Sequence, residues 1–226
     1  MSESLRLTRV EETPGDTLAK MYEGLKRIFD LVAALLGFIF LAPLLVAIAI
    51  VVKLDSVGPV LYLGERVGLH GNRFRICKFR TMCVGAEIHG TTTAAGDTRI
   101  TRVGRFIRKY KLDELPQLIN VIRGEMSLVG PRPEVEEHTS AYNDEEKLIL
   151  TVIPGITDYS SIRFVKLNEI LGSENPHELF VTKYRSEKNL LRLEYVRNRS
   201  FTEDLKILAL TLIALIRSAA GRVEPE

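Results

Sequence analysis

The feature that most constrains this chain is an uninterrupted run of 22 uncharged residues, Leu31 to Val52. About 20 apolar residues suffice to cross the hydrocarbon core of a bilayer, so the run is long enough to be a membrane segment. Basic residues flank it on both sides, with Lys26 and Arg27 before it and Lys53 and several arginines after it. Because basic flanks prefer the cytoplasmic face, a segment that enters and leaves on that face satisfies both flanks.

Pro43 lies near the middle of this run. Proline lacks a backbone N–H and its ring clashes with the preceding turn, so a helix bends or breaks there. The two arms would each cross about half a bilayer. We therefore predict a re-entrant membrane hairpin, helix–break–helix, over residues 20–57, with a spanning helix as the alternative. A buried core helix and a cleaved signal peptide fit the length and position of the run less well.

The remaining length accommodates one further domain, because the chain has 226 residues. We expect a mobile polar tail at 1–19, a catalytic domain at 58–217 and a short tail at 218–226. Two cysteines, Cys77 and Cys83, occur without a C-x-x-C pair. That pattern argues against zinc and is typical of reduced thiols in a cytoplasmic domain.

Charge is distributed unevenly along the chain. The net charge of +2 gives no overall field suited to nucleic acid, so we expect no nucleic-acid partner. Basic residues nevertheless outnumber acidic ones from Arg66 to Lys111. A local basic surface suits phosphates or anionic lipid headgroups. A solvated basic face beside a membrane is the simpler alternative.

Hydrophobic patterns predict an α+β domain that is mostly helical, with a short β-hairpin and amphipathic surface helices. The apolar segments 60–63 and 74–79 flank a glycine-rich turn, which favours a hairpin. An apolar stripe over 112–122 indicates a helix with Pro116 in its first turn and Gly124 at its end. Further helices are predicted over 134–149 and through most of 166–200. The segment 207–216 is too short to span a bilayer, and lies either at the membrane interface or against the core.

Asp113 and Glu114 are adjacent carboxylates at the predicted start of the 112–122 helix. The usual explanation for such a pair is compensation of the helix dipole. Here six basic residues precede the pair, and Arg132 follows between two prolines. A helix start with several guanidinium groups makes a phosphate site. A carboxylate within it could hold Mg²⁺ or attack phosphorus, and its neighbour could act as a base.

Several short motifs then match one family in the correct order. They are KRIFD at 26–30, GPV at 58–60, KFRTM at 78–82, DTRIT at 97–101 with Gly104, LDELPQL at 112–118, MSLVGPRP at 126–133 and PGIT at 154–157. In these motifs the chain resembles the bacterial sugar transferases, the monotopic phosphoglycosyl transferases that act on polyprenyl phosphate. The resemblance extends from Lys26 to about Ile216. It corresponds to a small form without the multi-helix N-terminal membrane domain of larger members.

The resemblance implies a two-step reaction. Asp113 would attack the β-phosphate of a UDP-sugar, UMP would leave, and polyprenyl (undecaprenyl) phosphate would accept the phosphosugar. Glu114 would serve as base or as metal-positioning partner, and Mg²⁺ would be shared between Asp113 and the substrate phosphates. Arg108 and Arg132 would bind the phosphates and nucleotide. Lys78 and Arg80 would shape the same pocket.

The same resemblance implies a cellular setting. The enzyme would be monotopic in the inner (cytoplasmic) membrane, with its catalytic domain facing the cytoplasm. Its reaction would be the first membrane step of exopolysaccharide, O-antigen or glycoprotein glycan synthesis. Membrane lipids are expected partners besides the two substrates, and a homodimer and downstream glycosyltransferases are candidate protein partners.

Three departures from the family pattern stand out. Ala42 precedes Pro43 where the family often has serine, and Lys111 precedes the LDELPQL motif where serine is also common. After PGIT the chain continues with Asp158, Tyr159 and two serines rather than glycine and a tryptophan-containing segment, which bears on the choice of sugar. Two other functions remain open: a glycosyltransferase that moves only the sugar and releases UDP, and a non-catalytic membrane scaffold that binds anionic lipids or partner proteins.

Overall fold

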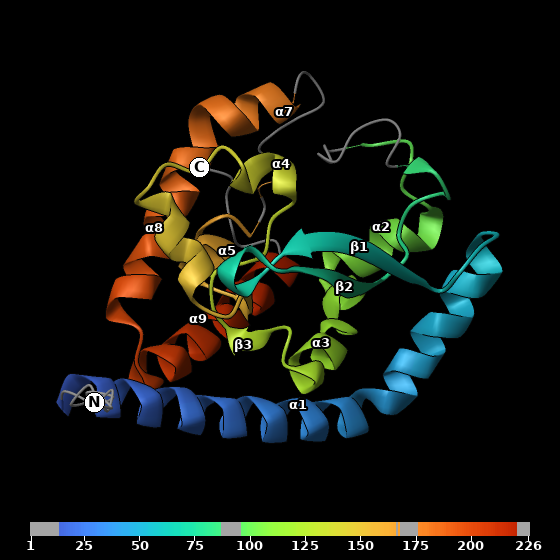
Figure 1. Cartoon of the computed structure of the whole chain (residues 1–226). Coiled ribbons are helices and arrows are strands. Elements are labelled where there is room, and N and C mark those ends of the chain that lie inside the picture. Colours follow the sequence, from blue (N-terminus) through green and yellow to red (C-terminus); the bar gives the residue numbers. More distant parts are fainter. Residues whose placement is uncertain (1–13, 87–95, 166, 168–175, 221–226) are drawn as a thin grey trace, which may run out of the picture.

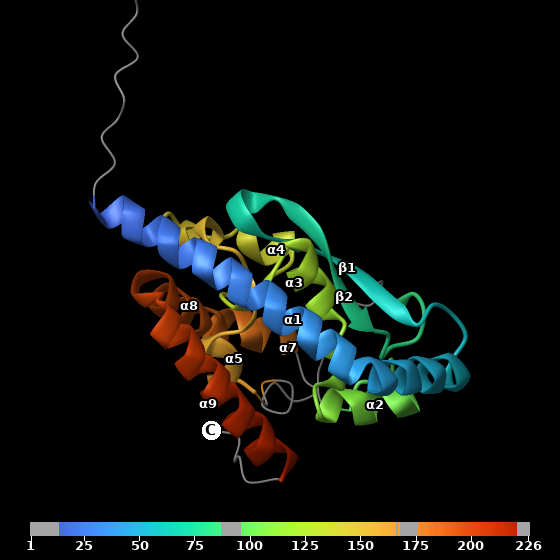
Figure 2. The same ribbon diagram turned by 90° about the horizontal axis from the view of Figure 1, so that it is seen from below.

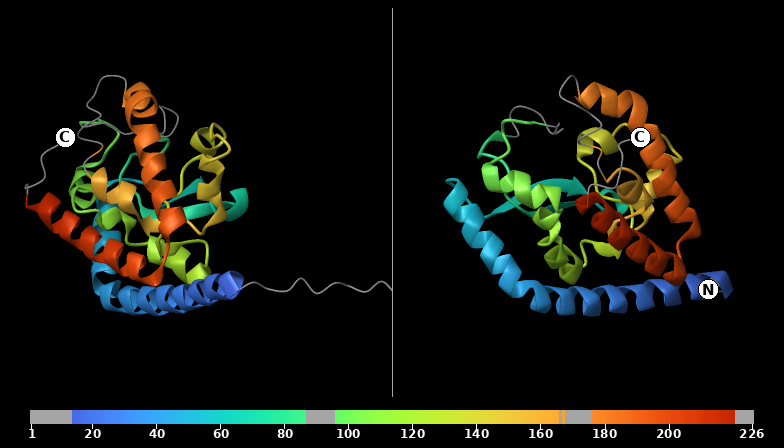
Figure 3. Two further views of the ribbon diagram at one scale, coloured as in Figure 1. Left: turned by 90° about the vertical axis from the view of Figure 1, so that its left-hand side faces the viewer. Right: turned by 180° about the vertical axis from the view of Figure 1, so that it is seen from behind.

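The computed structural model describes residues 14–86, 96–165, 167 and 176–220. These residues form a mostly helical domain with short β-strands, seated on one long helix, α1 (Pro14–Asp55) (Figure 1). The predicted α+β class is therefore confirmed. Views from two further sides show the domain on one side of α1, with the other side of the helix uncovered (Figure 3).

Helix α1 is continuous through Pro43, and it bends without breaking into two helices (Figure 1). A bend at a proline is expected because the residue cannot complete the helical hydrogen-bond ladder. Within the described part of the chain, α1 alone is long and apolar enough to cross a membrane, over Lys20–Asp55. Only 11% of its most apolar stretch is buried, and Phe40 is 84% exposed. A core helix would be buried, so α1 is a membrane-associating segment; its re-entrant course stays a prediction.

The predicted hairpin is confirmed and is longer than expected. Strands β1 (Leu61–Val67) and β2 (Arg73–Phe79) pair antiparallel, with Leu61 opposite Phe79 and Val67 opposite Arg73. A 3₁₀ turn over Leu69–Gly71 joins them, and His70 has a left-handed φ of 54° within it. His70 is thus a turn residue, as its position between glycines suggests.

A second sheet pairs β3 (Ser127–Val129) in parallel with β4 (Gly155–Thr157). The backbones of these two segments approach so closely that a Cβ on Gly155 would lie 2.0 Å from the backbone nitrogen of Gly130. Glycine is needed there because any side chain would collide with that backbone. The segment 153–155 leads directly into this strand.

Helix α2 covers Arg102–Lys109, and Gly124 ends α3 (Gln117–Arg123), as predicted, with a φ of 83°. Helix α3 begins later than predicted. Leu112–Glu114 forms a separate 3₁₀ turn, because Pro116 has no N–H to continue the α-helical ladder back through it.

The prediction of one helix over 134–149 is wrong. Helix α4 covers only Glu136–Thr139, and a 3₁₀ helix follows over Glu146–Thr151. Asn143 and Glu146 explain the interruption, because each side chain accepts a hydrogen bond from the other's backbone N–H at 2.9–3.0 Å. This reciprocal capping starts a new helical turn.

The remaining helices are α5 (Tyr159–Arg163), α7 (Pro176–Leu179) with a π-helical turn over Phe180–Tyr184, α8 (Arg185–Asn198) and α9 (Phe201–Ala219). Of these, α5, α8 and α9 pack beside the β3–β4 pair, and α7 contacts the start of α8 through the π-helical turn. The helical prediction for 166–200 is confirmed where residues are described. Residues 166 and 168–175 lie outside the described residues.

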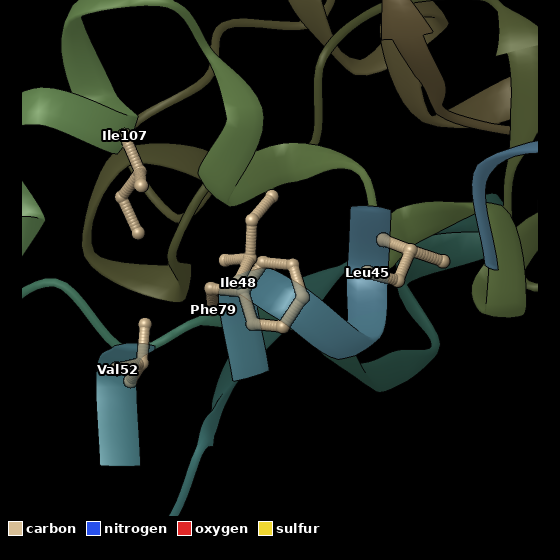
Figure 4. Close-up of a cluster of buried hydrophobic side chains, with 5 residues drawn as sticks. All are labelled: Leu45, Ile48, Val52, Phe79 and Ile107. Carbon is tan, nitrogen blue, oxygen red and sulfur yellow. The ribbon is translucent and has the colours of Figure 1, made fainter. Parts of the chain in front are cut away.

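The apolar end of α1 packs against the domain. Five buried side chains form one core cluster: Leu45, Ile48 and Val52 of α1, Phe79 of β2 and Ile107 of α2 (Figure 4). Nearer the N-terminus, Arg27 donates hydrogen bonds to the backbone oxygens of Val121 and Ile122 at the end of α3. The apolar helix is thereby fixed to the elements that carry the predicted site.

Helix α9 begins beside the first half of α1, as the view from below shows (Figure 2). Lys26 of α1 forms an ion pair with Asp204 of α9 at 2.8 Å, and the rings of Phe29 and Phe201 pack edge to face. One face of α9 contacts the core through the fully buried Ile207. Leu212 and Ile216 are each 60% exposed, so α9 covers the core on one face and presents an apolar face on the other.

Candidate active site

The turn that carries Asp113 and Glu114 is held against the hairpin by α3. Asn120 of α3 accepts a hydrogen bond from the backbone nitrogen of Cys77 and donates one to the backbone oxygen of Arg75, both at 2.8 Å. Lys111, in a left-handed conformation with φ 57°, starts the turn. The two carboxylates thus lie in a turn of their own immediately before α3, rather than in its first turn as predicted.

Glu114 is the acceptor for two cations that come from different elements. Lys78 of β2 donates from Nζ to Oε1 at 3.2 Å, and Arg132, after β3, donates from Nη2 to the same oxygen. Burial alone would raise the pKa of Glu114, but Arg132 and Lys78 outweigh it and lower that pKa below its usual range. Glu114 is consequently ionised and holds both cations in place.

Asp113 has a different environment from its neighbour. It is 7% exposed, and its Oδ1 has no hydrogen-bond partner among the described residues. Burial raises the pKa of Asp113, and the adjacent negative charge of Glu114 raises it further, while Lys78 and Arg108 oppose the shift. A buried carboxylate oxygen without a partner is energetically unfavourable, so Asp113 is suited to contact a bound ligand or ion.

Arg132 is fixed by its backbone and by its side chain. Pro131 and Pro133 restrict the chain on either side. The backbone nitrogen of Arg132 donates to Asp158 Oδ2 at 3.2 Å, and Nη1 donates to the backbone oxygen of Ile156 at 2.9 Å. The guanidinium therefore reaches Glu114 in one orientation.

Two further arginines predicted from sequence have separate anchors. Arg108 of α2 donates from Nε to Thr81 Oγ1 at 2.7 Å. Arg80 is 6% exposed and donates from Nη2 to the backbone and side-chain oxygens of Ser56, at 2.7 and 2.9 Å. Its Nε and Nη1 have no partner among the described residues. Arg80 thus joins the end of α1 to the site.

These groups surround one cavity of about 940 Å³. All six side chains predicted from sequence line it: Lys78, Arg80, Arg108, Asp113, Glu114 and Arg132. Apolar residues of α1 and α9, including Leu41, Ala214 and Leu215, form another part of its wall. Pro43 lies inside α1 and is not among the lining residues. The cavity therefore combines a cationic, carboxylate-bearing wall with an apolar one.

The cavity suits a magnesium ion held together with a phosphorylated ligand. No group of three or more histidine, cysteine, aspartate or glutamate side chains forms a complete metal cage within the described residues. Mg²⁺ commonly binds through one or two carboxylates, waters and substrate phosphates. The unpartnered Oδ1 of Asp113 fits that coordination, whereas Glu114 is already committed to Lys78 and Arg132.

The structure adds residues that the motifs did not indicate. Lys188 of α8 lines the same cavity. Behind Arg132, the fully buried Asp158 accepts a hydrogen bond from the backbone N–H of Ser161, and Arg192 lies 2.7 Å from Glu134. In the sequence, Asp158 replaces the glycine that often follows the PGIT motif in the family, and this difference was the one indication of the buried network. Nothing in the sequence distinguishes Lys188 from the exposed charges of the same helix.

Known proteins are similar to this chain in sequence over most of the domain. Over 146 residues, 63% of this chain and 34% of the relative, the sequence is 43% identical to the UDP-N-acetylgalactosamine-undecaprenyl-phosphate N-acetylgalactosaminephosphotransferase of Aeromonas hydrophila. Over 208 residues, 90% of this chain and 74% of the relative, it is 38% identical to the UDP-glucose:undecaprenyl-phosphate glucose-1-phosphate transferase of Caulobacter vibrioides.

A Xanthomonas campestris protein with that same activity in its name is 40% identical over 200 residues, 84% of this chain and 38% of the relative. The chain thus spans about a third of the length of the Aeromonas and Xanthomonas relatives. The profile of the bacterial sugar transferase family matches residues 21–218, which include most of α1 and every residue of the cavity wall. The chain belongs to the bacterial sugar transferase family.

Proposed function

We propose that this chain transfers a phosphosugar from a UDP-sugar to polyprenyl (undecaprenyl) phosphate and releases UMP, through a covalent intermediate on Asp113. The observation that carries the proposal is the cavity itself. It places a buried carboxylate with an unpartnered oxygen beside Lys78, Arg108 and Arg132, on a domain fixed to an exposed apolar helix. The relatives' names supply the substrate classes.

In the first step, an oxygen of Asp113 attacks the β-phosphorus of the UDP-sugar. A bond forms between that oxygen and phosphorus, and the bond from phosphorus to the bridging oxygen breaks. UMP leaves with the bridging oxygen and its electron pair. Lys78, Arg108 and Arg132 stabilise the charge that develops on the phosphate oxygens.

In the second step, a phosphate oxygen of the polyprenyl phosphate attacks the same phosphorus. The acyl phosphate bond breaks and the Asp113 carboxylate is restored. The product is a polyprenyl diphosphate sugar. Splitting one transfer into two displacements at a single residue is the general advantage of covalent catalysis.

Glu114 acts as a positioning group in this scheme rather than as a base. Its pKa is lowered and its Oε1 already accepts from Lys78 and Arg132, so it has little tendency to take a proton. It keeps the two cations directed at the phosphates. Asp113 would hold Mg²⁺ together with substrate oxygens, and the ion would supply charge neutralisation of the diphosphate when bound.

The setting follows from the same reaction. The substrate donor is a cytoplasmic nucleotide sugar and the acceptor is a membrane lipid, so the domain lies on the cytoplasmic face with α1 re-entrant in the inner membrane. The product would begin the assembly of a polysaccharide or glycan. A homodimer and contacts with downstream glycosyltransferases are compatible with such a role.

The released nucleotide tests the proposal. The full-length chain in detergent is incubated with a panel of UDP-sugars, undecaprenyl phosphate and Mg²⁺, and the nucleotide is separated by chromatography. UMP is expected with the wild-type protein and none with Asp113→Asn. Release of UDP would identify an ordinary glycosyltransferase. If Asp113→Asn released UMP as fast as the wild type, Asp113 would have no part in the mechanism. If the wild type released no nucleotide from any UDP-sugar, the scaffold alternative would be favoured.

A further inference from the structure

Lys188 contributes a cation to the candidate active site from an element that carries none of the sequence motifs. It lies on α8, within the segment that reads as a charged surface helix. Its side chain is nevertheless only 14% exposed, and it lines the cavity that contains Asp113 and Arg132. A lysine on a solvated helix face would have no reason to be buried there.

The contacts of Lys188 leave its charge incompletely compensated. Among the described residues, the nearest carboxylate oxygen is Glu134 Oε1, 3.9 Å from Nζ. The same oxygen lies 2.7 Å from Nη1 of Arg192, and Tyr142 donates a hydrogen bond to the other oxygen of Glu134 at 3.1 Å. Glu134 is therefore already neutralised by Arg192. Among the described residues, the Lys188 ammonium donates no hydrogen bond, and its remaining contact is with the ring of Phe180, 5.0 Å from Nζ.

A buried ammonium group with three donors and no acceptor is unfavourable. The pKa of Lys188 is lowered to about 8: burial is the main cause, the positive charge of Arg192 adds to it, and the negative charges of Glu134 and Asp158 oppose it. This direction agrees with the geometry, since a well-paired lysine would keep its usual pKa. An anion inside the cavity would supply both the charge and the hydrogen-bond acceptors that the protein does not.

We propose that Lys188 binds a substrate phosphate in this cavity. The inference rests on the proposed function, which brings two kinds of phosphate to the site: the diphosphate of the UDP-sugar and the monophosphate of the polyprenyl lipid. Lys188 shares the cavity with the apolar Ile162 and Phe164 and with Arg132. Either phosphate is chemically suited to that position, and kinetics with each substrate varied in turn distinguish them.

The principal test compares Lys188→Met, Lys188→Arg and a matched control in the full-length chain. Lys183→Met is the control, because Lys183 also lies over an aromatic ring, that of Tyr184 at 5.2 Å, but is exposed and does not line the cavity. We expect Lys188→Met to raise one KM by about tenfold to a hundredfold, with a smaller change in kcat, as expected for a lost charge-assisted hydrogen bond. Lys188→Arg should recover most of the loss, and Lys183→Met should change neither KM.

The affected substrate identifies the phosphate. A raised KM for the UDP-sugar assigns Lys188 to the diphosphate, and a raised KM for undecaprenyl phosphate assigns it to the lipid. Unchanged values for both substrates, accompanied by a lowered melting temperature, would overturn the proposal and leave Lys188 as a structural partner of Glu134. An insoluble Met variant is replaced by Lys188→Gln, which keeps most of the stem and a polar end.

The pH profile gives a readout that a purely structural role would not move. As the pH rises through about 8, free wild-type protein loses the Lys188 proton, so the affected KM should increase, whereas the Arg variant should stay flat. The charged groups around Lys188 are Arg132 and Glu134 before α4, Asp158 before α5, and Arg192 on α8, with His138 of α4 packed on Phe180. A profile that is identical in wild type and Lys188→Arg would contradict the proposal.

Failure of this proposal is separable from failure of the proposed function. Binding of a UDP-sugar to Asp113→Asn protein is measured by calorimetry, which requires no turnover. If the wild type releases UDP, or no nucleotide, the covalent mechanism is wrong. The phosphate contact would still be supported if the double variant Asp113→Asn, Lys188→Met binds the UDP-sugar more weakly than Asp113→Asn alone. If the wild type releases UMP and both substrates are unaffected by Lys188→Met, only the Lys188 assignment is lost.

Discussion

Ser127 Oγ donates a 2.6 Å hydrogen bond to Asp30 Oδ2, and both side chains are buried. The other oxygen of Asp30 accepts from the backbone nitrogen of Leu128 at 3.2 Å. One carboxylate of the apolar helix α1 thus joins it to β3, the strand that leads to Arg132. This contact explains why an acidic residue stands at the start of the apolar run.

Asp30→Asn should destabilise the protein by about 1–3 kcal/mol, because the amide offers one oxygen where two donors require acceptors. Glu23→Gln is the matched control on the same helix. Glu23 is 56% exposed and pairs with Arg199 at 3.1 Å, so its loss should cost about 1 kcal/mol or less. Thermal unfolding of both variants in detergent checks the difference, and equal melting temperatures would show that Asp30 contributes no specific contact.

Gly104 sets the distance between α2 and the segment after β2. A Cβ at this position would lie 2.1 Å from the backbone oxygen of Thr81, whose hydroxyl accepts from Arg108. Gly104→Ala should therefore destabilise the protein by about 1–3 kcal/mol and reduce activity, since the helix must move away.

Gly24 provides the control for that substitution. It lies in α1, and a Cβ added there would have no atom within 4 Å apart from its chain neighbours and the adjacent helix backbone, so Gly24→Ala should stabilise the helix by about 0.5–1 kcal/mol. Melting temperature and specific activity are measured for both variants. A Gly104→Ala protein as stable and active as Gly24→Ala would mean that α2 and the Thr81 backbone are not in close contact.

Arg132→Lys should lower kcat/KM by about tenfold to a hundredfold although it preserves the charge. Arg132 contacts Glu114 and the backbone oxygen of Ile156 at once, which a single ammonium group cannot reproduce. Arg73→Lys is the control, because Arg73 likewise contacts two acceptors at once, Glu65 and Glu136, but is 55% exposed and does not line the cavity. Normal kinetics for Arg132→Lys would assign Arg132 a structural role.

The course of α1 in the membrane can be tested by thiol labelling. Single cysteines replace Met21 and Ser186 in a chain lacking Cys77 and Cys83, and both positions are exposed. A membrane-impermeant thiol reagent should label neither cysteine in intact cells and both after lysis, because a re-entrant segment leaves both on the cytoplasmic side. Labelling of one position alone in intact cells would show that α1 spans the bilayer. Pro43→Leu should shift the protein toward that outcome, since a straight helix of this length reaches across.

The sequence was sufficient for features that depend on local patterns. Alternating residues beside a glycine-rich turn predicted the β1–β2 hairpin, and Gly124 correctly marked the end of α3. The adjacent carboxylates Asp113 and Glu114 and the basic residues of the motifs were predicted to share one site, and all six of these side chains line one cavity. Local periodicity and turn chemistry act over a few residues, which is why they can be read directly.

Other features were not predicted from hydrophobic patterns. The helix expected over 134–149 is divided by a local capping contact between Asn143 and Glu146, three residues apart, which the spacing of apolar residues does not show. Long-range packing escaped prediction for a different reason. Lys188 looks like any other lysine of a charged helix, and its burial results from α8 packing against the segment that contains Glu134. The parallel β3–β4 pair joins short segments far apart in the chain, so neither appears as a strand by itself.

The most direct test of the central claim is the intact mass of the protein after incubation with a UDP-sugar and Mg²⁺ in the absence of lipid acceptor. We predict a gain equal to one phosphosugar, located on Asp113 by peptide mapping and lost again when undecaprenyl phosphate is added. The Asp113→Asn protein should gain no mass under the same conditions. Formation of the lipid product by Asp113→Asn, or a wild-type adduct on any other residue, would contradict the account.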